Sequence, residues 1–280
     1  MSNKKNRILV PTDFTKVVDY AMDHAVKVAE ASNSDIHLLH ILVHDEHADV
    51  TKKRMDMEVA RLKDISGKVT VVPMARKGNV YDDIGSVAEE IGADLIIMGT
   101  HGLRGMQFLT GSRALRVITE SQVPFVVVQE KKIGPDGYKH IVVPMDLQRE
   151  TRQKVTEVAD MAKTFNSTVH VISPKEKDEF LHRHLANNLQ FARKYFGDRN
   201  IPCKTEVIDV SASKFHVGLL DYAKAINADL IAIMNEANES ILGVFSVSFE
   251  QEIITNDAMI PVLVINEKNT TSGMAGWTFQ

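Results

Sequence analysis

Short apolar runs alternate with amphipathic stretches along most of the chain. The apolar runs are rich in β-branched residues and lack polar alternation, which is typical of strands covered on both faces. In the first half they predict strands at Ile8–Val10, Ile36–Leu42, Val69–Met74, Leu95–Met98 and Phe125–Val128. The stretches between them place apolar residues three and four positions apart, as amphipathic helices do. They predict helices near Thr15–Ala31, Ala48–Ile65, Val80–Ile91 and Gly111–Ser121.

The helical stripes indicate which helix faces are buried. Alternation of strands with helices favours right-handed βαβ units, and hence a parallel sheet with helices on both faces. The stripes are Ala21, Ala25, Val28 and Ala29 in the first helix, Met55, Val59 and Leu62 in the second, and Phe180, Leu181, Leu185, Leu189, Ala192 and Phe196 in the second half.

The second half of the chain repeats the first. Ile8–Asp13 recurs as Ile141–Asp146, and three further strand segments recur in the same order at a slowly drifting spacing. These are Ile36–Leu39 with Val169–Ile172, Ala93–Ile96 with Ala228–Ile231, and Pro124–Val128 with Pro261–Ile265. We therefore expect an α/β protein of two tandem open-sheet domains, each with five mainly parallel strands flanked by helices. The expected boundaries are 1–133 and 139–268 for the domains, 134–138 for a linker and 269–280 for a flexible tail.

Composition and charge narrow the class of protein. Of 280 residues, 44% are hydrophobic and 25% are charged, which excludes disordered and fibrous proteins. A net charge of −4 offers no basic surface for nucleic acid or anionic lipid. The one cysteine, Cys203, cannot form an internal disulfide, and no apolar run reaches the ~18 residues of a membrane helix. The N-terminus lacks a signal-peptide pattern, so we expect a cytoplasmic protein. From the net charge and the lack of a membrane helix, we expect neither nucleic-acid nor membrane partners.

The candidate chemistry follows the first and fourth strands. Ligands of open parallel sheets bind beyond the carboxyl ends of the strands, where the winding direction switches. Pro11–Asp13 follows the first strand, and the glycine-rich segment Gly99–Gly105 follows the fourth. Gly111 and Ser112 then begin a helix, whose unpaired N–H groups favour an anion. The pattern indicates a phosphate cradle that faces an acidic residue.

These residues resemble the universal stress protein family, and the similarity covers both halves up to about residue 267. ATP-binding members carry Gly-x2-Gly-x9-Gly-Ser/Thr. Here Gly99 and Gly102 match, and eight residues rather than nine separate Gly102 from Gly111. The resemblance implies a Rossmann-like, adenine nucleotide alpha hydrolase-like fold.

The resemblance also implies a site for the base and ribose. The residues after the first strand border adenine and ribose, the backbone after the second strand faces adenine, and the end of the fourth strand contacts base and ribose. The residues implied are Pro11, Thr12, Asp13, Ile41, Met98 and Gly99.

By the same resemblance, Gly102, Gly111, Ser112 and Arg113 hold the phosphates, mostly through backbone N–H groups. Proximity in the sequence adds Arg104, because a guanidinium fork suits phosphate oxygens. The alternative for Arg104 is a solvated loop charge.

The second half departs from this pattern. Asn235–Ile241 follows its fourth strand without a glycine pair, and Glu236 and Glu239 place carboxylates where phosphates belong. Asp146 repeats Asp13 but has no partner motif. We expect one nucleotide site per chain, in the first half.

Alternatives without a ligand stay open. Asp13 could cap the following helix, and the glycine cluster could be an unoccupied turn. His101 has no nucleophile beside it, so we expect no catalytic residue. His40, His44 and His47 lack the spacing of zinc sites, so we expect no metal site.

The leading hypothesis is a regulatory or stress-response module that binds ATP, ADP or AMP, with or without magnesium. No lysine precedes Ser112, so the loop is not a Walker A motif, and at most slow ATP hydrolysis is expected. The alternatives are an ATP-cleaving or adenylating enzyme of a related fold, and a structural interaction module with vestigial sites. The resemblance implies that the edge strands Phe125–Val128 and Val262–Ile265 pair as an intramolecular pseudo-dimer, with a homodimer left open.

Overall fold

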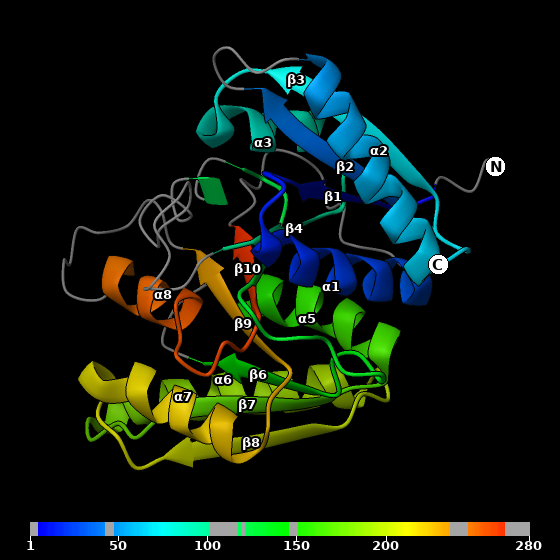
Figure 1. Ribbon diagram of the computed structural model, residues 1–280. Helices are drawn as coiled ribbons and strands as arrows, with labels where there is room; N and C mark the ends of the chain where they lie inside the picture. Colours follow the sequence, from blue (N-terminus) through cyan, green and yellow to red (C-terminus); the bar gives the residue numbers. More distant parts are fainter. Residues whose placement is uncertain are drawn as a thin grey trace. The chain divides into compact units, whose positions relative to one another are not determined.

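In the computed structural model the chain divides into two compact units, Met1–Ile133 and Gly134–Gln280. Each unit is an open α/β sheet (Figure 1). The structure describes residues 5–42, 48–100, 117–118, 121–145, 151–235 and 246–266. The described helices include none long and apolar enough to cross a membrane.

The first unit contains a parallel sheet in the order β3-β2-β1-β4-β5. The chain winds outward from β1 in one direction through β2 and β3, and in the other through β4 and β5. The winding direction therefore switches between β1 and β4. The strands are β1 Arg7–Pro11, β2 Asp35–Leu42, β3 Val71–Lys77, β4 Leu95–Gly99 and β5 Phe125–Val128.

Helices cover both faces of this sheet. Helices α1 (Lys16–Ser32) and α2 (Ala48–Ile65) contact each other on one face, and α3 (Val80–Ile91) packs on β1 and β2 from the other (Figure 1). The small apolar stripe of α1 lets the helix lie close to the sheet, and its four predicted residues are at most 1% exposed. Helix α3 begins where the Asn79 side chain accepts a hydrogen bond from the Tyr81 N–H.

The second unit repeats the topology, with the strand order β10-β9-β6-β7-β8. Its strands are β6 His140–Pro144, β7 Thr168–Pro174, β8 Cys203–Ile208, β9 Leu230–Asn235 and β10 Val262–Asn266. Its helices are α5 Thr151–Phe165, α6 Glu179–Gly197, η1 Ala212–Lys214, α7 Phe215–Ala225 and α8 Ser246–Ile254. Helices α5 and α6 contact each other on one face and α7 and α8 on the other (Figure 1). The predicted tandem α/β fold is confirmed.

Two local predictions are wrong. The third strand lies at Val71–Lys77 rather than at Val69–Met74, because it is an edge strand that pairs with β2 as far as Leu42. The strand ends in Arg76 and Lys77, and a search for apolar runs does not detect such a charged strand end. Phe180, predicted on the buried face of α6, is 70% exposed, because it lies in the first turn directly after the N-cap Asp178.

Of the helix predicted near Gly111–Ser121, only residues 117, 118 and 121 are described: Val117 and Ile118 are helical and Ser121 is not. Tyr138, at the end of the predicted linker, is fully buried in the second unit, with its ring 5.1 Å from that of Phe165.

Acid should destabilise the protein through His24 in α1. The His24 ring is 1% exposed, and its Nε2 donates to the Lys131 carbonyl at 3.0 Å. Burial lowers the pKa of His24 to about 4, so from pH 6.5 down to about 4 the unfolded chain binds this proton more readily. Stability is therefore lost as the pH falls through that window. His24→Gln keeps an amide donor and should reduce the loss between pH 7 and pH 4.5 by ~2–3 kcal/mol.

Urea unfolding at several pH values measures this effect. His184→Gln, at an exposed position of α6, is the matched control and should keep the wild-type pH dependence. An unchanged pH dependence in His24→Gln would show that the buried ring is not the cause.

Candidate functional site

The described site residues lie at the carboxyl ends of β1, β2 and β4. Pro11 ends β1, Ile41 is next to last in β2, and Met98 and Gly99 end β4. Since β1 lies between β2 and β4, these strand ends meet at one edge of the sheet, at the switch in winding direction. Thr12 and Asp13 follow β1 there. The predicted phosphate residues Gly102, Arg104, Gly111, Ser112 and Arg113 lie outside the described residues.

Thr12 joins the end of β1 to β2. Its side chain is buried, and its N–H donates to the Leu39 carbonyl at 2.7 Å. The Nδ1 atom of the buried His40 donates to the Thr12 carbonyl, also at 2.7 Å. The Thr12 hydroxyl oxygen in turn accepts from the Phe14 N–H at 3.1 Å. Every polar group of Thr12 therefore has a partner within the protein.

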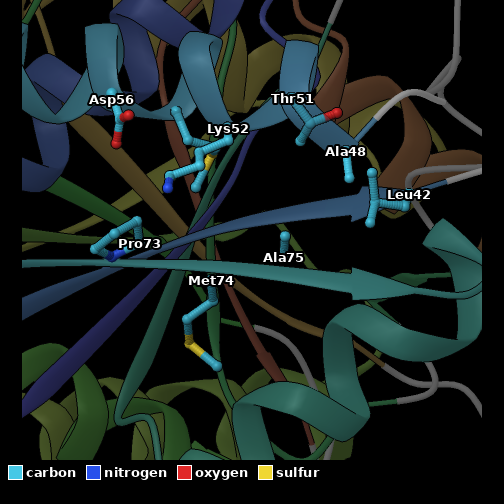
Figure 2. Close-up of a pocket in the computed structure, with 9 residues that line it drawn as sticks. Leu42, Ala48, Thr51, Lys52, Asp56, Pro73, Met74 and Ala75 are labelled. Carbon is cyan, nitrogen blue, oxygen red and sulfur yellow. The ribbon is translucent and has the colours of Figure 1, made fainter.

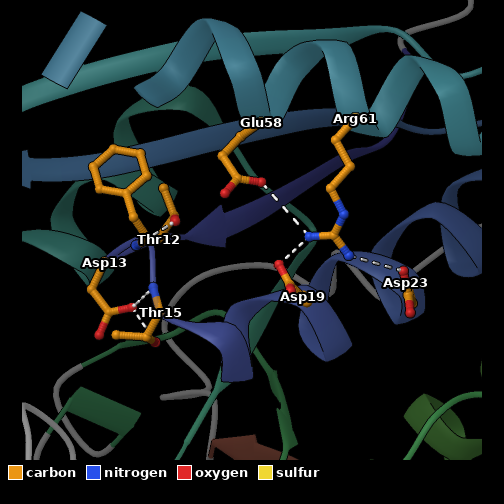
Figure 3. A network of polar contacts seen from close by, with 8 residues as sticks. Thr12, Asp13, Thr15, Asp19, Asp23, Glu58 and Arg61 are labelled. Carbon is orange, nitrogen blue, oxygen red and sulfur yellow. Dashed lines mark hydrogen bonds and ion pairs between the residues drawn. The ribbon is translucent and has the colours of Figure 1, made fainter. Parts of the chain in front are cut away.

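Asp13 is exposed and uses one carboxylate oxygen within the turn. Its Oδ1 accepts from the Thr15 N–H at 2.9 Å and from the Thr15 hydroxyl at 2.6 Å (Figure 3). Thr15 is the N-cap residue of α1 and makes no side-chain cap bond of its own. Asp13 thus fixes the start of α1, while its Oδ2 makes no hydrogen bond within the described part of the chain. The capping role and a ligand role are compatible.

Phe14 and Arg54 border the site, and neither was predicted from the sequence. Phe14 has a φ of 62°, and its ring centroid lies 4.5 Å from that of His40. The guanidinium carbon of Arg54, from α2, lies 5.5 Å from the Phe14 centroid. No sequence pattern signals a left-handed phenylalanine, because such a conformation depends on contacts with distant residues.

Packing against α1 favours a glycine at position 99. A Cβ atom at this position would lie 3.0 Å from the carbonyl oxygen of Val17 in the first turn of α1. A larger residue would require a shift of a few tenths of an ångström, so glycine favours the close approach of α1 to β4 whether or not a ribose binds. Met98 and Ile41, near the ends of β4 and β2, are buried at 1% and 5% exposure.

Further along α1 from the Asp13 turn, one arginine lies among three carboxylates. Arg61 of α2 pairs with Asp19 of α1, and lies 3.7 Å from Asp23 and 3.8 Å from Glu58 (Figure 3). Burial raises the pKa of the Glu58 carboxyl above its usual value; Arg61 opposes this and Asp19 adds to it. Burial likewise raises the pKa of Asp23. The group links α1 to α2 and carries more negative than positive charge.

A separate pocket of about 220 Å³ lies between α2 and the strands β2 and β3 (Figure 2). Its lining is mainly apolar, with Lys52 and Asp56 as charged members. The lining residues are Leu42, Ala48, Thr51, Lys52, Met55, Asp56, Pro73, Met74 and Ala75. None of the predicted site residues is among them. The pocket lies beside the predicted site and is not part of it.

The second unit fills the equivalent edge differently. Strand pairing aligns Ile8 with Leu95 and Ile141 with Leu230, so the buried Met234 stands where Gly99 does. The ammonium group of Lys154, a residue 3% exposed, donates to the Pro144 carbonyl at 3.0 Å.

Two further side chains close that edge. The Asn235 amide donates to the Asn266 side-chain oxygen at 2.7 Å. A lysine, a methionine and an asparagine pair therefore occupy the strand ends, and Asp146 lies outside the described residues.

Comparison with known proteins identifies the fold family. The sequence profile of the Universal stress protein family matches residues 5–129 and again residues 137–266. The chain belongs to the universal stress protein family. The resemblance inferred from the sequence is thereby confirmed, as a tandem member with one family domain in each unit.

Single-domain relatives match about half of this universal stress protein. It is 25% identical over 162 residues to one from Methanocaldococcus jannaschii, covering 47% of this chain and 99% of the relative. It is 30% identical over 139 residues to universal stress protein G of Shigella flexneri, covering 44% and 97%. A crystal structure of a universal stress protein from Archaeoglobus fulgidus covers 95% of this chain and 100% of its own, with a TM-score of 0.70 at 18% identity. That likeness shows the shared fold.

Removing one charge behind the site should stabilise this universal stress protein. At neutral pH the half-buried Glu58 carboxylate is disfavoured by its desolvation and by Asp19, and Arg61 offsets this only in part. Glu58→Gln keeps the shape of the side chain, and we expect unfolding free energy to rise by ~0.5–1 kcal/mol, a few degrees in Tm.

Thermal unfolding at pH 7 checks the Glu58 prediction. Glu30→Gln, at an exposed position of α1, serves as the control and should leave the midpoint nearly unchanged. A lower midpoint for Glu58→Gln would mean that the pairing with Arg61 outweighs the burial of the charge.

Proposed function

We propose that the first unit binds one adenine nucleotide at the carboxyl ends of β1 and β4, and that the protein acts as a nucleotide-responsive stress or regulatory module. The observation that carries this is the Asp13 carboxylate at the switch in winding direction, with one oxygen held by Thr15 and the other without a partner in the described chain. A carboxylate oxygen there accepts hydrogen bonds from ribose hydroxyl groups or from a base amino group. The glycine-rich segment after β4 would receive the phosphates.

One nucleotide per chain is proposed. In the second unit, Met234 replaces the close-approach glycine and Lys154 fills the space at the end of β6. We further propose a cytoplasmic location and, from the resemblance, pairing of the two halves as a pseudo-dimer.

The proposed role is binding without efficient catalysis. The Thr12 hydroxyl oxygen accepts the Phe14 N–H, and His40 Nδ1 donates to the Thr12 carbonyl, so these contacts make no pair of nucleophile and base. The Thr15 hydroxyl that donates to Asp13 serves the start of α1. Magnesium, if bound with ATP, would be held by the phosphates rather than by a dedicated protein cage.

Asp13→Asn should weaken nucleotide binding at least ~tenfold, equivalent to ~1.4 kcal/mol. The amide oxygen can still accept the Thr15 bonds, so the variant removes the charge while keeping the turn. Titration calorimetry with ATP, ADP and AMP, each with magnesium and with chelator, measures affinity, stoichiometry and the phosphates required.

Asp146→Asn is the matched control, because it changes the same position of the second repeat. This variant should bind about one nucleotide per chain with the wild-type affinity. If the wild-type protein binds none of the three nucleotides at millimolar concentration, the proposal fails and a structural interaction module becomes the better interpretation.

A further inference from the structure

The turn between β1 and α1 contains a backbone conformation that phenylalanine rarely adopts. Phe14 has a φ of 62°, in the left-handed region, where a bulky side chain crowds the following carbonyl. Strained residues of this kind persist where surrounding contacts determine them, and they gather at functional sites. Phe14 directly follows Asp13, the residue on which the proposed function depends.

Three contacts hold Phe14 in this conformation. Its N–H donates to the Thr12 hydroxyl oxygen at 3.1 Å. Its ring lies on the buried His40 ring, with centroids 4.5 Å apart and planes at 36°. Arg54 lies 5.5 Å from the ring centroid, within the range of a cation–π contact. His40 itself is fixed by its bond to the Thr12 carbonyl, so the ring rests on a rigid surface.

The conformation of Phe14 sets where the Asp13 carboxylate lies. Asp13 Oδ1 reaches the Thr15 N–H two residues along the chain, so Phe14 is the central residue of this side-chain turn. Its φ and ψ therefore determine whether the carboxylate meets both Thr15 donors.

We propose that Phe14 is a positioning residue: its tilted ring contact with His40 holds the turn in the conformation that fixes Asp13 Oδ1 on Thr15 and presents Oδ2 to an adenine nucleotide. The part that concerns the nucleotide rests on the proposed function. The part that concerns the turn can be tested without any ligand.

The second unit supports this assignment by contrast. Strand pairing aligns Pro11 with Leu39 and Pro144 with Ile172, so Ser173 stands where His40 does. Ser173 is fully buried, and its hydroxyl has no hydrogen-bond partner in the described chain. The ring that supports Phe14 is thus absent from the half in which we expect no nucleotide.

Two substitutions separate the effect of the Phe14 ring from the effect of its backbone conformation. Phe14→Gly adopts a positive φ without strain but removes the ring. Phe14→Tyr keeps the ring and the strain. If the ring contact with His40 positions Asp13, Phe14→Tyr preserves the turn and Phe14→Gly loses it. If only the backbone conformation matters, Phe14→Gly preserves the turn. Phe180→Ala, at an exposed phenylalanine of the second unit, is the control for loss of an aromatic side chain.

The first measurement is hydrogen exchange of the Thr15 amide in the ligand-free protein. We expect its protection to fall at least ~tenfold in Phe14→Gly and to change less than ~twofold in Phe14→Tyr and Phe180→Ala. Unchanged protection in Phe14→Gly would overturn the inference, whatever the nucleotide results.

The second measurement is the affinity for ATP in a double-mutant cycle. We expect Phe14→Gly to weaken binding at least ~tenfold in the wild-type background and less than ~twofold when Asp13 is already Asn, because Phe14 acts through that carboxylate. Equal weakening in both backgrounds would overturn the positioning role. Absence of ATP binding by the wild-type protein would instead overturn the proposed function, and with it the claim that Phe14 presents Asp13 to a nucleotide. The exchange experiment would still decide whether Phe14 fixes Asp13 on Thr15.

Discussion

The hydrogen bond from the His40 ring to the Thr12 carbonyl fixes where β1 ends and where the chain turns. Both groups are buried, so a missing partner there would cost ~1–3 kcal/mol. With the bond in place, His40 gives Phe14 a surface to rest on, and Phe14 in turn sets the path from Asp13 to Thr15. An exposed carboxylate at the edge of the sheet is thus held in place by interactions beneath it.

The two units show how one backbone supports different chemistry. Met145 repeats the backbone bond of Thr12, with its N–H 2.7 Å from the Ile172 carbonyl. The side chains around that shared bond differ: Ser173 replaces His40, and the carbonyl of the last strand residue, Pro144, is satisfied by Lys154. A parallel sheet fixes the positions of its strand ends, while function depends on the side chains placed there.

The sequence predicted the elements well because each leaves a regular pattern. The helices Ala48–Ile65 and Val80–Ile91 have the predicted bounds, since apolar periodicity is a local property. Phe180 was misplaced because periodicity does not say where a helix leaves its sheet. Of the candidate site, the order of strands places Pro11, Asp13 and Ile41 together, and this much was predictable.

The geometry of the site was not predictable from the sequence. The conformation of Phe14 depends on His40 and Arg54, which lie 26 and 40 positions further along the chain, and no local pattern contains that information. The packing role of Gly99 was likewise not predictable, because the approach of Val17 is a tertiary contact.

Helix α1 connects these features. Its first turn lies against Gly99, its start is fixed by Asp13, and further along Asp19 pairs with Arg61 of α2. A ligand that engages Asp13 would bind the residue that fixes the start of α1. A shift of α1 would change its contacts with both β4 and α2. Because cores are close-packed, such a shift cannot be absorbed by one contact alone. Arg61 is the contact between α1 and α2 on this path, and burial raises the pKa of the Asp23 and Glu58 carboxyls beside it, so part of its attraction offsets the cost of burying those charges.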